Sequence, residues 1–162
     1  MTRKLYFLRH GKAASRSTWE GDDGLRPLTP EGETLMRREA VGLRRLGLAP
    51  DVIITSPLVR ARQTAEIAAE ALGLRDRLVE DARLAHGFDA RCLERLAAER
   101  PEAAELMVVG HEPEFSATIA ELIGGGCVDM KKGGLARVDV GGPGLEDGVL
   151  EWLLTPSQLA GE

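Results

Sequence analysis

Short apolar runs alternate with longer amphipathic segments along most of the chain. The runs at residues 5–8, 52–54 and 106–109 are too short for helices and predict buried strands. The longer segments between them carry apolar residues at the three- to four-residue spacing of a helix. Strands that alternate with helices in this way are typical of a parallel sheet covered by helices. We therefore expect an α/β fold of three layers, α/β/α, around a mostly parallel sheet.

The first long helix is predicted to begin at Thr29-Pro30, because threonine is a good N-cap and proline fits the first helical position. Its apolar stripe is expected at Leu35, Leu43 and Leu46. Gly47 is the expected end of this helix, since glycine readily adopts the conformation that follows a helical C-terminus.

A second helix is predicted from Ser56-Pro57, which repeats the Ser/Thr-Pro start, to Gly73. Its apolar residues recur at helical spacing: Leu58, Ala61, Ala65, Ile67, Ala68 and Leu72.

Further elements are predicted in the second half of the chain. A weaker strand is expected at residues 77–80, followed by a helix at 90–99. Pro113 should start another helix that breaks at the glycines 124–126. Two strands, at 135–140 and 149–154, are joined by a turn region rich in glycine and are expected to pair at the edge of the sheet.

Histidine and arginine residues follow three of the predicted strands. Arg9 and His10 come at the end of the first apolar run, and His111 follows the run at 106–109. Arg60 and Arg62 lie in the first turns of the helix that follows the run at 52–54. Because the carboxyl ends of parallel strands meet at one edge of a sheet, where open α/β folds place their ligand sites, we expect a functional site there.

The residue types at these strand ends indicate phosphoryl chemistry. Arginines that converge repel each other unless an anion lies between them, and their planar donors fit phosphate oxygens. A neutral imidazole can attack phosphorus, provided that the developing charge on the oxygens is stabilised. His10 is the candidate nucleophile, and Arg9, Arg60 and His111 are the candidate stabilising groups.

A metal site is the alternative use of the histidines. Three are present, His10, His86 and His111, and three imidazoles can hold a catalytic zinc. Neighbouring arginines would oppose a divalent cation, and the histidine spacing does not match a preformed site. We therefore expect no metal.

Composition narrows the class of protein. The chain has 162 residues, 43% of them hydrophobic and 29% charged, which predicts one globular domain over residues 1–162. Its formal net charge of −5 argues against a nucleic-acid or membrane-surface partner. No apolar run approaches the roughly 20 residues of a membrane span. Cys92 and Cys127 lie far apart in the sequence and do not have the spacing of a metal or redox site, so reduced thiols are expected. A cleavable leader would remove the Arg9-His10 pair, and we therefore predict a cytoplasmic location.

Three segments resemble the signature segments of the histidine phosphatase superfamily, also called phosphoglycerate-mutase-like. They are residues 8–11 (Leu-Arg-His-Gly), 56–65 (Ser-Pro-Leu-Val-Arg-Ala-Arg-Gln-Thr-Ala) and 109–113 (Val-Gly-His-Glu-Pro), in the expected order. The short length and the segment 23–32 are most similar to the SixA-type phosphohistidine phosphatases.

This resemblance implies a role for individual residues. His10 would be the phosphorylated nucleophile, Arg9 and Arg60 the phosphate clamp, and His111 the second histidine of the phosphate pocket. No cofactor is implied. Arg26 would contact substrate, with the alternative that it is a surface arginine held extended by the proline that follows it.

The proton donor for the leaving group is left open. Many members of the superfamily carry an acid on the loop after the third strand, where this chain has His86. Either His86 donates the proton, or Glu80, Asp81 or Asp89 does, or no dedicated acid exists, with His86 then a substrate contact or an exposed loop residue. The absence of a dedicated acid favours a phosphoramidate substrate, because a phosphorus–nitrogen bond is activated and its leaving group needs less help from a proton donor.

The same loop bears on substrate size. Larger relatives insert a helical lid there, whereas here only the short segment 81–89 separates the predicted strand from the next helix. We therefore expect a compact form with an open pocket, which would admit a phosphohistidine on another protein. The resemblance implies a phosphatase that forms a phosphohistidine intermediate, and we expect it to remove phosphate from phosphohistidine on a protein. The alternatives are a broad phosphomonoesterase for small phosphorylated molecules and a phosphate-binding regulatory protein without turnover.

Overall fold

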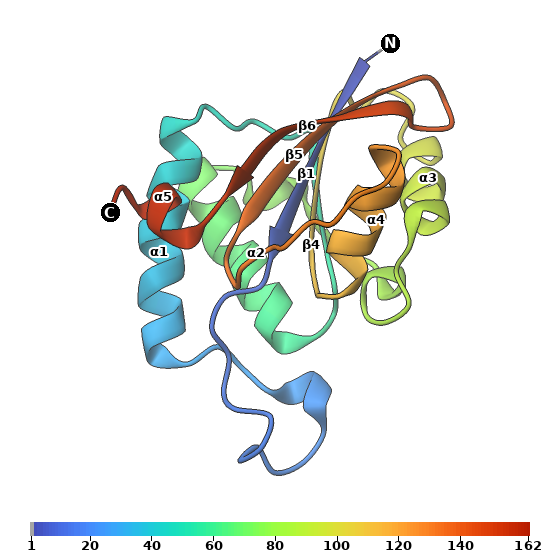
Figure 1. Cartoon of the computed structure of the whole chain (residues 1–162). Helices are drawn as coiled ribbons and strands as arrows, with labels where there is room; N and C mark the ends of the chain where they lie inside the picture. The colour runs from blue at the N-terminus through green and yellow to red at the C-terminus, as the bar shows by residue number, and fades with distance from the viewer. Residues whose placement is uncertain (1) are drawn as a thin grey trace.

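The computed structural model describes residues 2–162 and contains a six-stranded sheet with helices on both faces (Figure 1). The strands are β1 (Thr2–Arg9), β2 (Val52–Thr55), β3 (Leu78–Glu80), β4 (Glu105–Gly110), β5 (Leu135–Gly141) and β6 (Glu146–Leu154), and their order in the sheet is β3-β2-β4-β1-β5-β6. Parallel ladders join β3 to β2, β2 to β4 and β4 to β1. The two remaining ladders, β1 with β5 and β5 with β6, are antiparallel.

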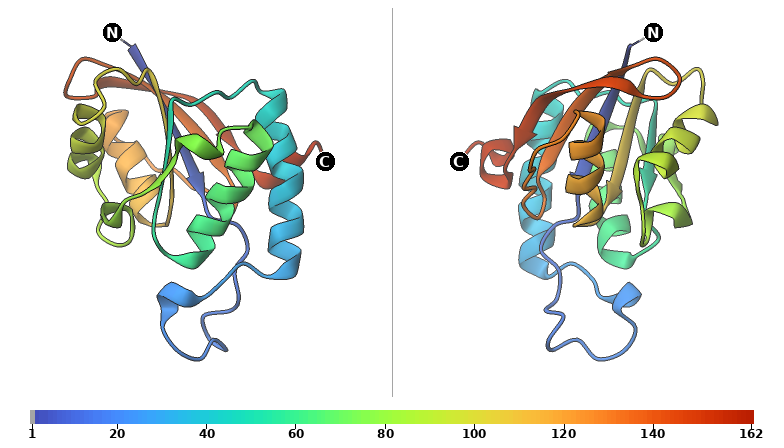
Figure 2. Two further views of the ribbon diagram at one scale, coloured as in Figure 1. Left: turned by 180° about the vertical axis from the view of Figure 1, so that it is seen from behind. Right: turned by 45° about the vertical axis from the view of Figure 1, so that its right-hand side comes forward.

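Helices cover the sheet on two sides, which confirms the expected three layers (Figure 2). They are α1 (Pro30–Arg45), α2 (Val59–Leu72), α3 (Ala90–Ala98), α4 (Glu114–Leu122) and α5 (Pro156–Ala160), with short 3-10 turns η1 (Asp23–Leu25), η2 (Arg75–Arg77) and η3 (Ala82–Leu84). Helices α1, α2 and α5 supply buried residues to one hydrophobic cluster, and α3 and α4 supply them to the other. Among residues 2–162, no helix is both long enough and apolar enough to cross a membrane.

The apolar run of the central strand β1 is continuous because the strand is covered on both faces. Successive side chains of a strand point to opposite faces, so a strand covered on both faces is apolar at every position. Leu5 and Phe7 lie in the cluster with α3 and α4, whereas Tyr6 and Leu8 lie in the cluster with α1 and α2. All four side chains are buried.

The boundaries of α1 follow the prediction. The Thr29 hydroxyl accepts a hydrogen bond from the Gly32 backbone N–H at 2.9 Å, and Pro30 occupies the first helical position. The helix ends at Arg45, and Gly47 adopts a φ of 72° shortly after it.

The predicted apolar stripe of α1 is wrong at two of its three positions. Leu43 is buried, but Leu35 is only half-buried and Leu46 is 39% exposed. The buried face instead runs through Met36, Ala40 and Leu43, which also follow helical spacing. Both stripes satisfy the same periodicity, and the position of α1 against α2 and α5 decides which of them is buried.

The predicted start of α2 is also wrong, because Ser56 does not cap this helix. The backbone remains extended at Leu58, and the helix begins at Val59. The Ser56 hydroxyl accepts a hydrogen bond from the Leu58 N–H at 3.2 Å and has a second partner in the site described below. The predicted end at Gly73 is confirmed, with a φ of 70°.

The C-terminal strands form the antiparallel hairpin that the sequence predicts. Strand β6 lies at one edge of the sheet and begins at Glu146, earlier than expected. Its pairing with β5 is irregular between Arg137 and Val138 and again between Asp139 and Gly141.

The carboxyl ends of the central strands meet at one edge of the sheet. Arg9 of β1 pairs with Gly110 of β4, and Thr55 of β2 pairs with Val109 of β4. The residues that follow these strand ends therefore start from neighbouring points. The segment between β1 and α1 extends beyond this edge and returns through η1 (Figure 1).

Candidate active site

A hollow of about 690 Å³ lies at this edge of the sheet. Its lining includes six of the residues that the sequence singled out: Arg9, His10, Arg26, Arg60, His86 and His111. Arg62, the other arginine predicted near these strand ends, does not line it. The six residues come from the end of β1, the segment before α1, the first turn of α2, the loop after β3 and the end of β4. The fold thus brings together side chains that are up to about one hundred residues apart in sequence.

His10 is held in one tautomer by its own loop. Its Nδ1 lies 2.7 Å from the carbonyl oxygen of Gly11. A carbonyl oxygen can only accept, so Nδ1 carries the hydrogen and Nε2 of the neutral ring keeps its lone pair. Burial lowers the pKa of His10 to about 4 despite the bond to Gly11, and the charges of Arg60 and Arg9 act in the same direction as burial. His10 is therefore a neutral imidazole with a free Nε2 near neutral pH.

The backbone beside His10 is tied to two other parts of the site. The His10 N–H donates to the Gly110 carbonyl at 3.0 Å, next to His111. The Gly11 N–H donates to the Thr64 hydroxyl at 3.1 Å, and that hydroxyl donates to the Arg60 carbonyl at 2.8 Å. Thr64 is buried and links the loop after β1 to α2. The only sign of this role in the sequence is the place of Thr64 in the signature segment 56–65.

His111 packs against the second strand end. Its Nε2 lies 2.8 Å from the Ser56 hydroxyl, which is the second partner of that side chain. A Cβ at Gly110 would lie 2.8 Å from the Phe115 ring, so glycine allows the turn after β4 to pack closely on α4. Burial lowers the pKa of His111 to about 3, with a smaller contribution from His10. His111 is thus a neutral hydrogen-bonding group in this structure.

Arg26 and Arg60 share one carboxylate. Asp23 Oδ1 accepts from Arg26 Nε at 3.0 Å, and Asp23 Oδ2 accepts from Arg60 Nη2 at 3.1 Å. Arg60 Nη1 also donates to the Asp23 carbonyl oxygen, at 2.9 Å. Burial raises the pKa of Asp23, but the bond from Arg26 and the charge of Arg60 outweigh it and lower the pKa overall. Arg26 is only 7% exposed, so it is not a surface arginine.

Several buried donors of the site lack a protein partner. Within residues 2–162, Arg9 Nε, Arg60 Nε and His111 Nδ1 are buried and make no hydrogen bond. Arg9 is otherwise fixed by a 2.8 Å bond from Nη1 to the Met130 carbonyl. Buried polar groups are nearly always paired in folded proteins, so two unpaired guanidinium N–H groups and an unpaired imidazole nitrogen around one hollow indicate a ligand that offers acceptors. A tetrahedral oxyanion fits this description.

His86 joins the other two histidines. Its ring centroid lies 6.3 Å from that of His111 with the ring planes 27° apart, and the His10 and His111 centroids are 5.3 Å apart. His86 lines the hollow while remaining exposed.

The three acidic candidates for the proton donor have other partners. Asp81 accepts from the Arg83 side chain at 2.7 Å, and Asp89 accepts from the backbone N–H of Cys92 at 2.8 Å at the start of α3. Glu80 lies 3.5 Å from Arg62. None of the three lines the hollow. His86 is therefore the one candidate among the four that does.

The hollow also contains charged residues that sequence reasoning missed. Two carboxylates line it, Glu112 and Glu114, and three further cations do so, Lys12, Arg16 and Lys132. Only Glu112 had a signal in the sequence, its place beside His111 in the third signature segment. Within residues 2–162, no group of three or more His, Cys, Asp or Glu side chains is arranged to hold a metal ion.

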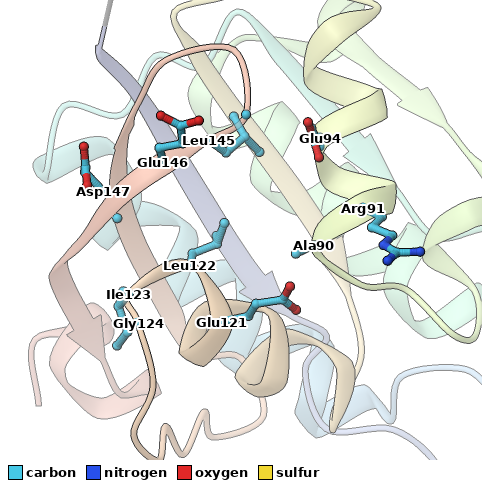
Figure 3. Close-up of a pocket in the computed structure, with 12 residues that line it drawn as sticks. Ala90, Arg91, Glu94, Glu121, Leu122, Ile123, Gly124, Leu145, Glu146 and Asp147 are labelled. Atoms are coloured by element: carbon cyan, nitrogen blue, oxygen red, sulfur yellow. The ribbon is translucent and has the colours of Figure 1, made fainter.

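A second hollow, of about 740 Å³, lies beneath the β5–β6 turn (Figure 3). Its charged lining consists of Arg91, Glu94, Glu121, Glu146 and Asp147. Of the described residues that line it, none is a histidine, serine, threonine or cysteine. His10, His111 and the arginines Arg9, Arg26 and Arg60 line the first hollow instead, which we take as the candidate active site.

Comparisons with known proteins identify the family of the chain. Residues 5–88 match the model of the histidine phosphatase superfamily (branch 1). An uncharacterised protein from Picosynechococcus is 44% identical over 138 residues, which cover 82% of each chain. The structure of the protein histidine phosphatase SixA complexed with tungstate is similar with a TM-score of 0.85 at 25% identity, over 96% of this chain and 99% of that one. The mycobacterial glucosyl-3-phosphoglycerate phosphatase shares the fold, with a TM-score of 0.72 at 19% identity, over 96% of this chain and 100% of that one.

Proposed function

Because this chain belongs to the histidine phosphatase superfamily and is a phosphatase, we propose that it removes phosphate from phosphohistidine on a protein, with His10 as the nucleophile. The observation that carries this proposal is the 2.7 Å contact between His10 Nδ1 and the Gly11 carbonyl. It leaves the Nε2 lone pair free to attack, and the lowered pKa of His10, about 4, keeps the ring neutral.

The reaction proceeds in two steps. The Nε2 lone pair of His10 attacks phosphorus, the bond between phosphorus and the substrate nitrogen breaks, and its electron pair leaves with that nitrogen, which takes up a proton from solvent water. Water then attacks the phosphorus of the phosphorylated His10 and loses a proton. The bond to Nε2 breaks, orthophosphate leaves, and His10 returns to its neutral form.

The partnerless donors supply stabilisation during both steps. The Nε–H groups of Arg9 and Arg60 are buried beside His10, so an oxyanion that enters can accept from them. His111 Nδ1 donates as well when its Nε2 accepts from the Ser56 hydroxyl. Donors fixed in advance around developing negative charge typically contribute about 2.7–4 kcal/mol each. Asp23 holds Arg26 and Arg60 together and limits their mutual repulsion.

Two features favour phosphohistidine as the substrate. Glu80, Asp81 and Asp89 have other partners and do not line the hollow, which suits an imidazole leaving group better than an alcohol. The segment between β3 and α3 contains only the short turn η3, so no helical lid covers the hollow from this side. The similarity to SixA, whose solved structure holds the phosphate-like oxyanion tungstate, supports the same substrate class.

A small phosphomonoester is the second candidate substrate. The position of His86 near His111 favours it, because a histidine at the hollow could protonate an alcohol as it leaves. In the first candidate reaction His86 contacts the substrate instead.

The protein acts in the cytoplasm in this proposal. Cys92 and Cys127 are both free, and Cys127 is exposed, which suits a reducing compartment such as the cytoplasm.

A single-turnover experiment tests the proposed function. A phosphotransfer domain with radiolabelled phosphohistidine is mixed with the wild type or with His10→Ala and quenched in alkali, beside a parallel reaction with p-nitrophenyl phosphate. Rapid loss of label from the domain, with an alkali-stable adduct on the wild type alone, is the expected result. Slow loss of label beside fast turnover of the aryl ester would assign the activity to small phosphomonoesters. Unchanged activity of His10→Ala would refute the nucleophile.

A further inference from the structure

Two cations at the mouth of the active site are not needed to hold the reacting phosphate. Six arginine and lysine side chains line the hollow. Arg26 and Arg60 are buried, and Arg9 is half-buried with its Nε enclosed. Lys12 is paired with Glu31 at 2.6 Å. Arg16 and Lys132 remain, and we refer to these two residues as the mouth cations.

The backbone at Lys132 is held beside His10 by the residues on either side of it. On one side, the Met130 carbonyl accepts from the Arg9 side chain at 2.8 Å. On the other, the Gly133 N–H donates to the carbonyls of Arg9 at 3.2 Å and His10 at 3.0 Å. Gly133 has a φ of +81°, a conformation that suits glycine and turns the chain at this point. Lys132 is itself exposed, and within residues 2–162 no carboxylate lies at ion-pair distance from it.

Arg16 is also weakly paired. Its side chain is 81% exposed, and its nearest carboxylate oxygen, Asp23 Oδ1, is 3.9 Å away. That oxygen already accepts a 3.0 Å bond from Arg26. Arg16 lies in the segment after β1 and Lys132 in the loop before β5, so the mouth cations come from two separate loops.

We propose that the mouth cations bind carboxylate groups on the protein that carries the phosphohistidine, next to the modified residue. This inference rests on the proposed function and specifies its partner as acidic around the phosphorylation site. The long, exposed mouth cations suit a negative charge that lies outside the phosphate pocket, because Arg9, Arg26 and Arg60 are available to bind the phosphate within it. The chain as a whole has a net charge of −5 and repels an acidic partner elsewhere. Glu112 and Glu114 also line the hollow, but they are half-buried whereas the mouth cations are exposed. Attraction at the mouth cations would therefore orient the encounter.

Two synthetic phosphohistidine peptides of equal length test this inference. One carries glutamates on both sides of the phosphohistidine, and the other carries glutamines at the same positions. The measured quantity is the ratio of kcat/KM for the two peptides, which cancels any general loss of activity. It is compared among the wild type, Arg16→Glu, Lys132→Glu and the control Lys131→Glu. Lys131 is adjacent in sequence and exposed, but it is paired with Asp129 at 2.6 Å and does not line the hollow.

The wild type is expected to prefer the glutamate peptide, and each mouth variant to lower the ratio by about fivefold, the upper range for one exposed charge pair. Added salt should reduce the preference of the wild type, and Lys131→Glu should keep the wild-type ratio. Equal rates for the two peptides on the wild type, or an equal effect of Lys131→Glu, would overturn the inference while the proposed function stands. If neither peptide loses phosphate, the proposed function fails and the inference fails with it.

Phosphoserine distinguishes a small carboxylated substrate from an acidic protein segment. The mouth variants should change its kcat/KM far less than that of the glutamate peptide. An equal loss on phosphoserine would show that the mouth cations bind the carboxylate of a small phosphomonoester, which contradicts the assigned partner.

Discussion

The carboxylate of Asp23 lies 3.1 Å from Arg60 Nη2 and bridges this arginine to Arg26. The two arginines would repel each other at the site without the carboxylate between them. Asp23 therefore holds two arginines of the hollow in place from η1, although it does not line the hollow itself.

Replacing Asp23 with asparagine should weaken oxyanion binding without removing the arginines. Loss of a hydrogen bond to a charged group costs about 1.5–3 kcal/mol. Asp23 is partly exposed, so the lower end applies, and kcat/KM should fall roughly tenfold. Inhibition by vanadate should weaken in parallel. The matched control is Asp22→Asn, since the Asp22 side chain bonds only the Gly24 backbone N–H in this structure. Equal effects of the two variants would show that the loop, not the bridge, matters.

His10, the proposed nucleophile, should remain active well into acid. Burial lowers the pKa of His10 to about 4, so the ring keeps its Nε2 lone pair until the pH falls to that value. We expect kcat/KM for p-nitrophenyl phosphate to show an acid limb near pH 4 and not near 6.5, the ordinary histidine value. Circular dichroism at each pH serves as the control for folding. An acid limb near 6.5 in folded protein would contradict this picture of His10.

Variants of His86 should separate its two possible roles. If His86 protonates the leaving group, His86→Asn lowers turnover of an alkyl phosphate by roughly 100-fold or more, the usual contribution of a general acid. Turnover of p-nitrophenyl phosphate, whose leaving group needs little help, should fall much less. The measurement is the dependence of kcat on leaving-group pKa for wild type and variant. An equal decrease for all substrates would assign His86 to substrate contact.

Stability should depend on pH through Glu39, a buried residue of α1 that is 3% exposed. Burial raises the pKa of Glu39 to about 8, from an ordinary value of 4.5. Between these values the unfolded chain loses this proton and the folded chain keeps it. The contribution of Glu39 to the free energy of unfolding is therefore fully present below pH 4.5 and decreases as the pH rises towards 8.

The variant Glu39→Gln removes this dependence with little change of shape. It should gain stability relative to wild type as the pH rises from 4.5 to 8, and urea unfolding at several pH values measures the difference. Exposed Glu70→Gln on α2 is the control. A difference between wild type and Glu39→Gln that does not change with pH would show that Glu39 ionises normally in the folded protein.

Local patterns in the sequence determined the architecture of this protein and the candidate nucleophile. The apolar run of β1 predicts a strand buried on both faces, and Tyr6 and Phe7 do lie in different clusters. The caps at Thr29 and Gly73 mark helix boundaries because capping depends on neighbouring residues. The positions of His10 and His111 follow from the rule that parallel strands end at the same edge.

The sequence alone did not reveal the contacts between distant segments. Ser56 has the local signature of a helix cap, yet its hydroxyl bonds His111, 55 residues away. Asp23 reaches Arg60 across 37 residues, and Thr64 reaches Gly11 across 53.

The candidate proton donors and the apolar stripe of α1 also show what the local sequence leaves undecided. Asp81 and Asp89 are acids in the expected loop, but η3 and α3 use them as caps, whereas His86 comes to the hollow. Periodicity allowed two stripes on α1, and packing buried the one with Met36 and Ala40. Local sequence thus determined which elements form and where their ends meet, because propensities and caps act between near neighbours. Only the tertiary structure decided the partner of each polar side chain, because that choice depends on which distant groups packing places within hydrogen-bond distance.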